Sequence, residues 1–139
     1  MPDLVFVDSN IFVYAHDRSH PLKHSKARAV VRKCWDEESG CLSLQVLQEF
    51  YVNVTRKVRR PLSPKAGREL IATYAVWPLA VLAPEHLVRA SELEERYQLH
   101  FWDALIVAAA TILGASTILS EDLQDGQTIE GIVIRNPLL

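Results

Sequence analysis

Short apolar runs alternate along the chain with longer segments in which apolar residues recur every three or four positions. The run 4–7 (Leu-Val-Phe-Val) has no polar interruption, which is typical of a strand buried on both faces. Segment 45–59 instead carries Leu47, Phe50 and Val54 at the spacing of one helix face. The pattern therefore predicts strands and helices in alternation.

Turn and cap residues divide this pattern into elements. Gly40 and Gly114 follow two predicted helices, Pro61 ends a third, and Ser63-Pro64 is typical of a helix start. We predict strands at residues 4–7, 41–44, 79–82, 116–119 and 132–134. We predict helices at residues 11–15, 22–38, 45–59, 64–76, 84–97 and 101–113.

Strands separated by one or two helices form βαβ units, which pair in parallel through right-handed crossovers. We therefore expect an α/β fold of three layers, with a mostly parallel central sheet of about five strands and helices on both faces. The length of 139 residues fits a single domain, residues 1–139, that buries enough core to need no disulfide.

Composition bears on the cellular compartment and on membrane attachment. The two cysteines, Cys34 and Cys41, have no metal-ligand spacing, and the chain begins without a secretory leader pattern, so we expect a reduced, cytoplasmic protein. The apolar stretch 104–113 is about half the ~20 residues that a membrane span needs, so we expect no membrane attachment.

Charge excludes a globally basic nucleic-acid-binding surface. The formal net charge is −2, so a polyanion would have to meet a local patch. One candidate patch combines Arg56, Lys57, Arg59 and Arg60. These cations could bind an RNA backbone, or could simply be a solvated helix end that complements the helix dipole.

Four of the 17 acidic residues interrupt apolar segments. Asp8 follows the first strand, Glu49 lies early in the helix after the second, Asp103 opens the last long helix, and Asp122 follows the fourth strand. Residues after parallel strands meet at the carboxyl edge of the sheet, where ligands bind. Asp103 would join them only if its helix starts at that edge.

Such a cluster would repel itself unless a cation lay among the carboxylates. Mg²⁺ and Mn²⁺ prefer carboxylate and water oxygens, so either ion would fit. Each acid also has an ordinary structural explanation. Asp8 and Asp103 could be helix N-caps, Glu49 a partner of the helix dipole, and Asp122 a turn residue.

The residues that carry these acids resemble the PIN-domain ribonucleases. The resemblance rests on the opening strand into Asp8-Ser9-Asn10, on Glu49, on the element 102–105 (Trp-Asp-Ala-Leu), and on the segment 118–122 (Ile-Leu-Ser-Glu-Asp). Within that family the chain is most similar to the VapC-type toxins of type II toxin-antitoxin pairs, along essentially its whole length.

The resemblance implies a site and a reaction. Asp8, Glu49, Asp103 and Asp122 would be the catalytic acids, with Asp8, Asp103 and Asp122 as metal ligands, and with Asn10 and Ser120 supporting them. Bound Mg²⁺ or Mn²⁺ would activate a water for hydrolysis of an RNA phosphodiester. Glu121 and Asp125 are further acids that could complete the site in place of Asp122. Trp102 is bulkier than the small residue expected beside Asp103.

The resemblance also implies partners, namely an RNA substrate, a small antitoxin protein and a second copy in a homodimer. Three other hypotheses belong to different classes. His16, His20 and His24 could suggest zinc, but Pro21 interrupts their helix, which favours exposed loop histidines. A phosphotransfer enzyme would need an acid at position 10, or a lysine after residue 114, and neither occurs. A PIN-like module without catalysis, binding RNA or protein, is the main alternative.

Overall fold

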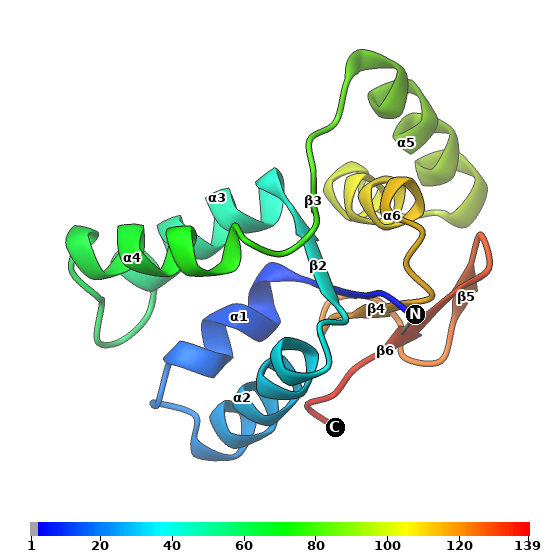
Figure 1. The fold of residues 1–139 in the computed structure, drawn as a ribbon. Helices are drawn as coiled ribbons and strands as arrows, with labels where there is room; N and C mark the ends of the chain where they lie inside the picture. The colour runs from blue at the N-terminus through cyan, green and yellow to red at the C-terminus, as the bar shows by residue number, and fades with distance from the viewer. Residues whose placement is uncertain (1–2) are drawn as a thin grey trace.

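A six-stranded sheet organises the computed structural model, which describes residues 3–139 (Figure 1). The strands run in the order β3-β2-β1-β4-β6-β5, and every neighbouring pair is parallel except β5 and β6. Their bounds are β1 (Val5–Val7), β2 (Gly40–Ser43), β3 (Leu79–Ala80), β4 (Thr117–Leu119), β5 (Thr128–Ile129) and β6 (Ile132–Arg135). The predicted α/β fold with a mostly parallel sheet is confirmed.

Helices cover both faces of this sheet. Figure 1 places α1 and α2 together on one side and α5 and α6 together on the other. The helices are α1 (Ser9–His16), α2 (Pro21–Asp36), α3 (Leu44–Val52), α4 (Pro64–Tyr74), α5 (Pro84–Tyr97) and α6 (Phe101–Leu113). The bounds of α5 and α6 are those predicted, because Pro84 and Gly114 punctuate them clearly.

The strand order reverses between β1 and β4. From β1 the chain crosses outward to β2 and β3, and then returns to place β4 on the other side of β1. Such a reversal opens a crevice at the carboxyl edge of the sheet, and this is where open α/β sheets bind ligands.

The sequence did not predict β5. This two-residue strand pairs antiparallel with β6 through a tight turn at Glu130 and Gly131, both of which have positive φ values (51° and 79°). A strand of two residues is too short to show an alternating pattern, so only the tertiary pairing reveals it.

The predicted helix 45–59 was too long. Regular α-helix ends at Val52, a wider π-helical turn, η1 (Asn53–Lys57), follows, and Val58 is extended. The Asn53 side chain donates to the Glu49 carbonyl (2.7 Å), while the Val58 N–H reaches back to the Asn53 carbonyl (3.1 Å). Side-chain competition for helix carbonyls is a recognised cause of such irregular turns.

An aromatic cluster fills the space between α1, α3 and α4. Phe12 packs against Phe50, Tyr74 and Trp77, with ring centroids 4.5–6.0 Å apart. Tyr74 and Trp77 are buried in this cluster, whereas Tyr51 is half-buried. Burying each large apolar side chain contributes about 1.5–3 kcal/mol.

Across residues 3–139, none of the helices combines the length and the apolar character that crossing a membrane requires.

Candidate active site

Asp8 lies at the carboxyl end of β1 and caps α1. Its side chain is 3% exposed and accepts hydrogen bonds from the Ser9 backbone N–H (2.7 Å) and from the Ser120 hydroxyl (2.8 Å). Burial, together with the charges of Glu49 and Asp122, raises the pKa of Asp8 to about 7 against the lowering effect of those two hydrogen bonds. The predicted cap role and the predicted cluster role therefore coexist in one residue.

Ser120 connects Asp8 to the loop that follows β4. Its hydroxyl donates to Asp8 and accepts from the backbone N–H groups of Asp122 (3.1 Å) and Leu123 (3.4 Å). Ser120 is completely buried, so these bonds replace its contacts with water. The hydroxyl thus shapes the loop and orients the buried carboxylate at once.

Asn10 connects the same two segments from the α1 side. Its amide nitrogen donates to the Asp122 carboxylate (3.0 Å) and reaches that of Asp8 (3.5 Å), and its amide oxygen accepts from the Glu121 backbone N–H (3.1 Å). One side chain thereby brings together two carboxylates separated by 114 positions in the sequence.

Glu49 approaches from α3. The Ser9 hydroxyl donates to the Glu49 carboxylate (3.3 Å), so α3, the helix that follows β2, contacts α1 here. Burial raises the pKa of Glu49, and the charges of Asp103 and Asp122 add to this against hydrogen bonds from Ser9 and Gln45. Glu49 therefore faces the same crevice as the other acids.

Asp103 joins them from the first turn of α6. Burial raises the pKa of Asp103, the Asp122 charge raises it further, and His100 opposes both. The Gln45 side chain donates to the Trp102 carbonyl (3.3 Å), so the start of α6 lies beside the start of α3. The helix return that Asp103 required is present, and the structure brings all four acids to one edge of the sheet.

Glu121 and Asp125 point away from this edge. Glu121 pairs with the Lys23 ammonium (2.7 Å) and accepts from the Tyr14 hydroxyl (3.1 Å), while Asp125 accepts from the Asn136 backbone N–H (2.8 Å). Of the three acids that follow β4, Asp122 is the one that Asn10 connects to Asp8. Sequence spacing could not separate them, because the partners Lys23 and Asn10 come from distant segments.

The donor set fits a hard divalent cation. Within residues 3–139, none of the four clustered acids forms an ion pair with Lys or Arg, although burial and neighbouring carboxylates raise the pKa values of Asp8, Glu49 and Asp103. In the same range no three His, Cys, Asp or Glu side chains lie close enough together to hold a metal ion as the structure stands. Carboxylate oxygens are the ligands that Mg²⁺ and Mn²⁺ prefer, and a cation would remove this repulsion.

The predicted basic patch lies along η1 and the loop after it. Arg56, Lys57, Arg59 and Arg60 are all exposed, and none forms a salt bridge with a described residue. Arg56 and Lys57 end the helical segment, where a dipole role is available, but Arg59 and Arg60 lie beyond it. The dipole alternative therefore explains two of the four cations.

Two of the three clustered histidines form hydrogen bonds within the fold. His16 shares a hydrogen bond with the Tyr74 hydroxyl (2.7 Å), and His24 shares one with the Tyr14 carbonyl (2.8 Å). Both lie in helices, so the prediction of exposed loop histidines was wrong for these two, whereas His20 is exposed and precedes α2. Their roles depend on tyrosines in other segments, which spacing alone does not reveal.

The sequence profile of the PIN domain family matches residues 5–124, which include all four clustered acids. The chain belongs to the PIN domain family. No curated protein sequence matches the chain closely enough to be informative.

Solved structures agree in fold at low sequence identity. A toxin-antitoxin complex from Klebsiella pneumoniae contains a chain 19% identical, with a TM-score of 0.70 over 96% of this chain and 97% of that one. DNA-bound VapBC from Salmonella typhimurium matches at 14% identity, with a TM-score of 0.66 over 98% and 99%. VapC20 from Mycobacterium tuberculosis, a toxin that cleaves the sarcin-ricin loop, matches at 16% identity, with a TM-score of 0.63 over 85% and 89%.

Proposed function

We propose that this protein is a Mg²⁺- or Mn²⁺-dependent endoribonuclease and the toxin of a type II toxin-antitoxin pair. The observation that carries the proposal is the group of four carboxylates at the sheet reversal, with no ion pair to Lys or Arg among the described residues. Family membership and the likeness in fold to VapC20 support RNA as the substrate.

Each acid has a distinct place in this proposal. Asp8, Asp103 and Asp122 hold the metal, and Glu49 faces the same crevice from α3. A bound divalent ion supplies an activated water and balances charge on the phosphate oxygens. Ser120 and Asn10 keep Asp8 and Asp122 at a constant separation, so that the site is preorganised before RNA arrives.

Arg56, Lys57, Arg59 and Arg60 serve as the contact to the RNA backbone. They are exposed and have no salt-bridge partner in the described part of the chain. The cations would offset the repulsion between an acidic site and a phosphate backbone. Cys34 and Cys41 are free and buried, which supports a cytoplasmic location.

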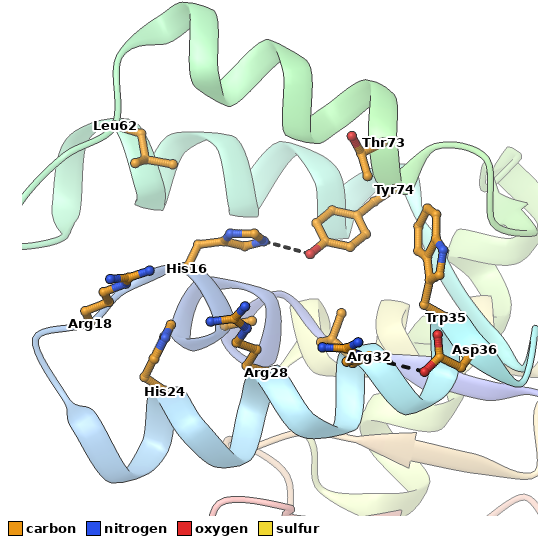
Figure 2. A pocket seen from close by; sticks show the side chains of 12 residues that line it. His16, Arg18, His24, Arg28, Arg32, Trp35, Asp36, Leu62, Thr73 and Tyr74 are labelled. Carbon is orange, nitrogen blue, oxygen red and sulfur yellow. Dashed lines mark hydrogen bonds and ion pairs between the residues drawn. The ribbon is translucent and has the colours of Figure 1, made fainter.

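The antitoxin partner fits a basic groove of about 640 Å³ between α2 and α4 (Figure 2). Arg18, Arg28 and Arg32 line the groove, and Tyr74 and Trp35 lie at one end of it. Arginine beside aromatic side chains suits a partner segment that carries carboxylates and large apolar residues. The complexes from Klebsiella and Salmonella support a protein partner of this kind.

A homodimer is also proposed, and apolar side chains near the outer edge of the sheet support it. Val81 is 62% exposed just after β3, Leu44 is 41% exposed at the start of α3, and Trp102 is 66% exposed at the start of α6. Because Ser43 and Ala80 pair across β2 and β3, Leu44 and Val81 lie side by side. Exposed apolar groups of this kind favour a contact between copies.

A cleavage assay tests the function. Purified protein is incubated with total cellular RNA in Mg²⁺, in Mn²⁺ or in chelator, beside the variants Asp103→Asn and Asp122→Asn. We expect metal-dependent cleavage by the unmodified chain and a loss of at least about 100-fold in both variants, since each removes a ligand charge while keeping side-chain volume. Asp125→Asn is the matched control and should cleave normally.

Two results would contradict the proposal. Cleavage that persists in chelator would remove the metal from the mechanism. Folded protein that binds Mn²⁺ but cleaves no RNA would instead favour the catalytically inactive PIN module that binds RNA or protein.

A further inference from the structure

A hollow of about 300 Å³ lies beyond the acid cluster, between the end of α1, the loop 17–20 and η1. Its polar and aromatic lining comes from Tyr14, His20, Asn53, Lys57 and Arg59. The volume is at the lower limit of small-ligand sites, which suits a single nucleotide unit. Neither the acid cluster nor the groove of Figure 2 includes this hollow.

The hollow is a direct extension of the candidate active site. Glu49 and Asn53 are one turn apart along α3 and η1, and the Asn53 amide donates to the Glu49 carbonyl (2.7 Å). Along α1, Asn10 and Tyr14 are likewise one turn, about 5.4 Å, apart, so two lining residues follow residues of the site by one helical turn. Figure 1 shows α1 and α3 leaving the sheet toward the same side.

Tyr14 also joins the hollow to the loop that follows β4, which carries Asp122. Its hydroxyl donates to Glu121 (3.1 Å), the neighbour of Asp122, while its ring contacts that of His20 edge-on with centroids 5.6 Å apart. A polymer whose phosphate lies at the acids would therefore bring its next unit to these rings. The Lys23 ammonium lies 5.0 Å from the centre of the Tyr14 ring, which helps hold that ring in place.

The lining combines the groups that recognise an unpaired nucleotide. Aromatic rings stack on bases, an amide can hydrogen-bond to a base edge, and cations bind phosphate. Lys57 and Arg59 are exposed and have no salt bridge to a described residue. Asp17 is the one carboxylate in the lining, and it accepts two hydrogen bonds from Ser19 (3.1 and 2.6 Å).

We infer that this hollow is a specificity-determining subsite, which holds the base of the nucleotide adjacent to the scissile phosphate against His20, Tyr14 and Asn53. The inference rests on the proposed nuclease function. It predicts that base identity matters at one position beside the cut, and that Lys57 and Arg59 bind the phosphate of the same nucleotide.

The test uses the full chain and a randomised single-stranded oligoribonucleotide in Mn²⁺, with sequencing of the products. We expect the unmodified chain to prefer certain bases at one flanking position. His20→Ala should flatten the preference at that position alone, and Arg59→Ala should raise KM about fivefold or more. Both variants should retain Mn²⁺ affinity, because neither residue contacts the four acids.

Lys33→Ala, which removes an exposed cation from α2, is the matched control and should leave KM and the preference unchanged. An unchanged base preference in His20→Ala, or no preference in the unmodified chain, would overturn the subsite while the nuclease function stands. If the unmodified chain cuts no oligonucleotide in Mn²⁺, the proposed function and the subsite both fall, and this outcome is distinct from the first two.

Discussion

Asp8 combines two requirements that oppose each other. As the cap of α1 it must be buried against the sheet, and as a metal ligand it must carry a negative charge. Burial raises its pKa to about 7, so near neutral pH the metal-free fold carries a costly half-ionised carboxyl group. A substitution that removes the Asp8 charge is therefore expected to raise stability while it impairs metal binding.

Substitution of Asp8 by Asn tests that divergence. The folded-state pKa of about 7 lies above the ordinary value of 3.8, so the unfolded chain loses its proton first. The free energy of unfolding of metal-free protein should fall as pH rises from about 4 to about 7 and then level off. Asp8→Asn should lose the share of this fall that Asp8 contributes, leaving the smaller share of Glu49 and Asp103, and should be more stable at pH 8 by up to about 4 kcal/mol.

Urea denaturation in chelator at pH 5 and pH 8 measures both effects. Asp36→Asn, an exposed acid on α2, is the control and should follow the unmodified chain. Mn²⁺ at about 100 times its Kd should stabilise the unmodified chain by about 2.7 kcal/mol and Asp8→Asn by much less. Equal pH dependence in the two proteins would refute a raised pKa for Asp8.

At the scale of elements, β2 and the segment before β3 approach each other unusually closely. A Cβ atom added to Gly40 would lie 2.5–2.7 Å from ring atoms of Trp77, and Trp77 is itself buried in the aromatic cluster. Glycine at the start of β2 thus lets the indole lie against the backbone. The sequence suggested only a helix-ending role for Gly40, because Trp77 lies 37 positions away.

Gly40→Ala should therefore destabilise the fold by about 1–3 kcal/mol, through displacement of the Trp77 ring. Urea denaturation of the single variant measures this cost. Trp77→Leu also costs stability, but the double variant should be more stable than the two single effects predict, because the smaller side chain removes the clash. If the free-energy changes of the two single variants simply add in the double variant, then Gly40 is not needed to make room for the Trp77 ring.

At the scale of the whole molecule, charge is distributed unevenly despite a net charge of only −2. Acids gather at the carboxyl edge of the sheet, while cations lie beside it on η1 and along the groove between α2 and α4. Binding to a polyanion would then depend on local cations more than on net charge.

Salt dependence measures that local contribution. Anisotropy of a labelled single-stranded oligoribonucleotide reports binding to cleavage-defective Asp103→Asn chain in Mn²⁺ at several salt concentrations. Adding Arg60→Gln should reduce the slope of log affinity against log salt by about 0.7, the value for one phosphate contact on a single strand. Arg96→Gln on α5 is the control, and an unchanged slope for Arg60→Gln would assign that cation to solvation alone.

The sequence by itself determined the order of strands and helices, the mostly parallel sheet, and the acids that follow strands. These features depend on local periodicity, caps and the geometry of parallel pairing, all of which are visible in neighbouring residues. Tertiary structure alone decided that α6 begins beside Glu49, that β5 pairs with β6, and that Glu121 turns to Lys23 while Asp122 meets Asn10. These arrangements depend on contacts between segments up to 112 positions apart, which leave no periodic pattern in the sequence.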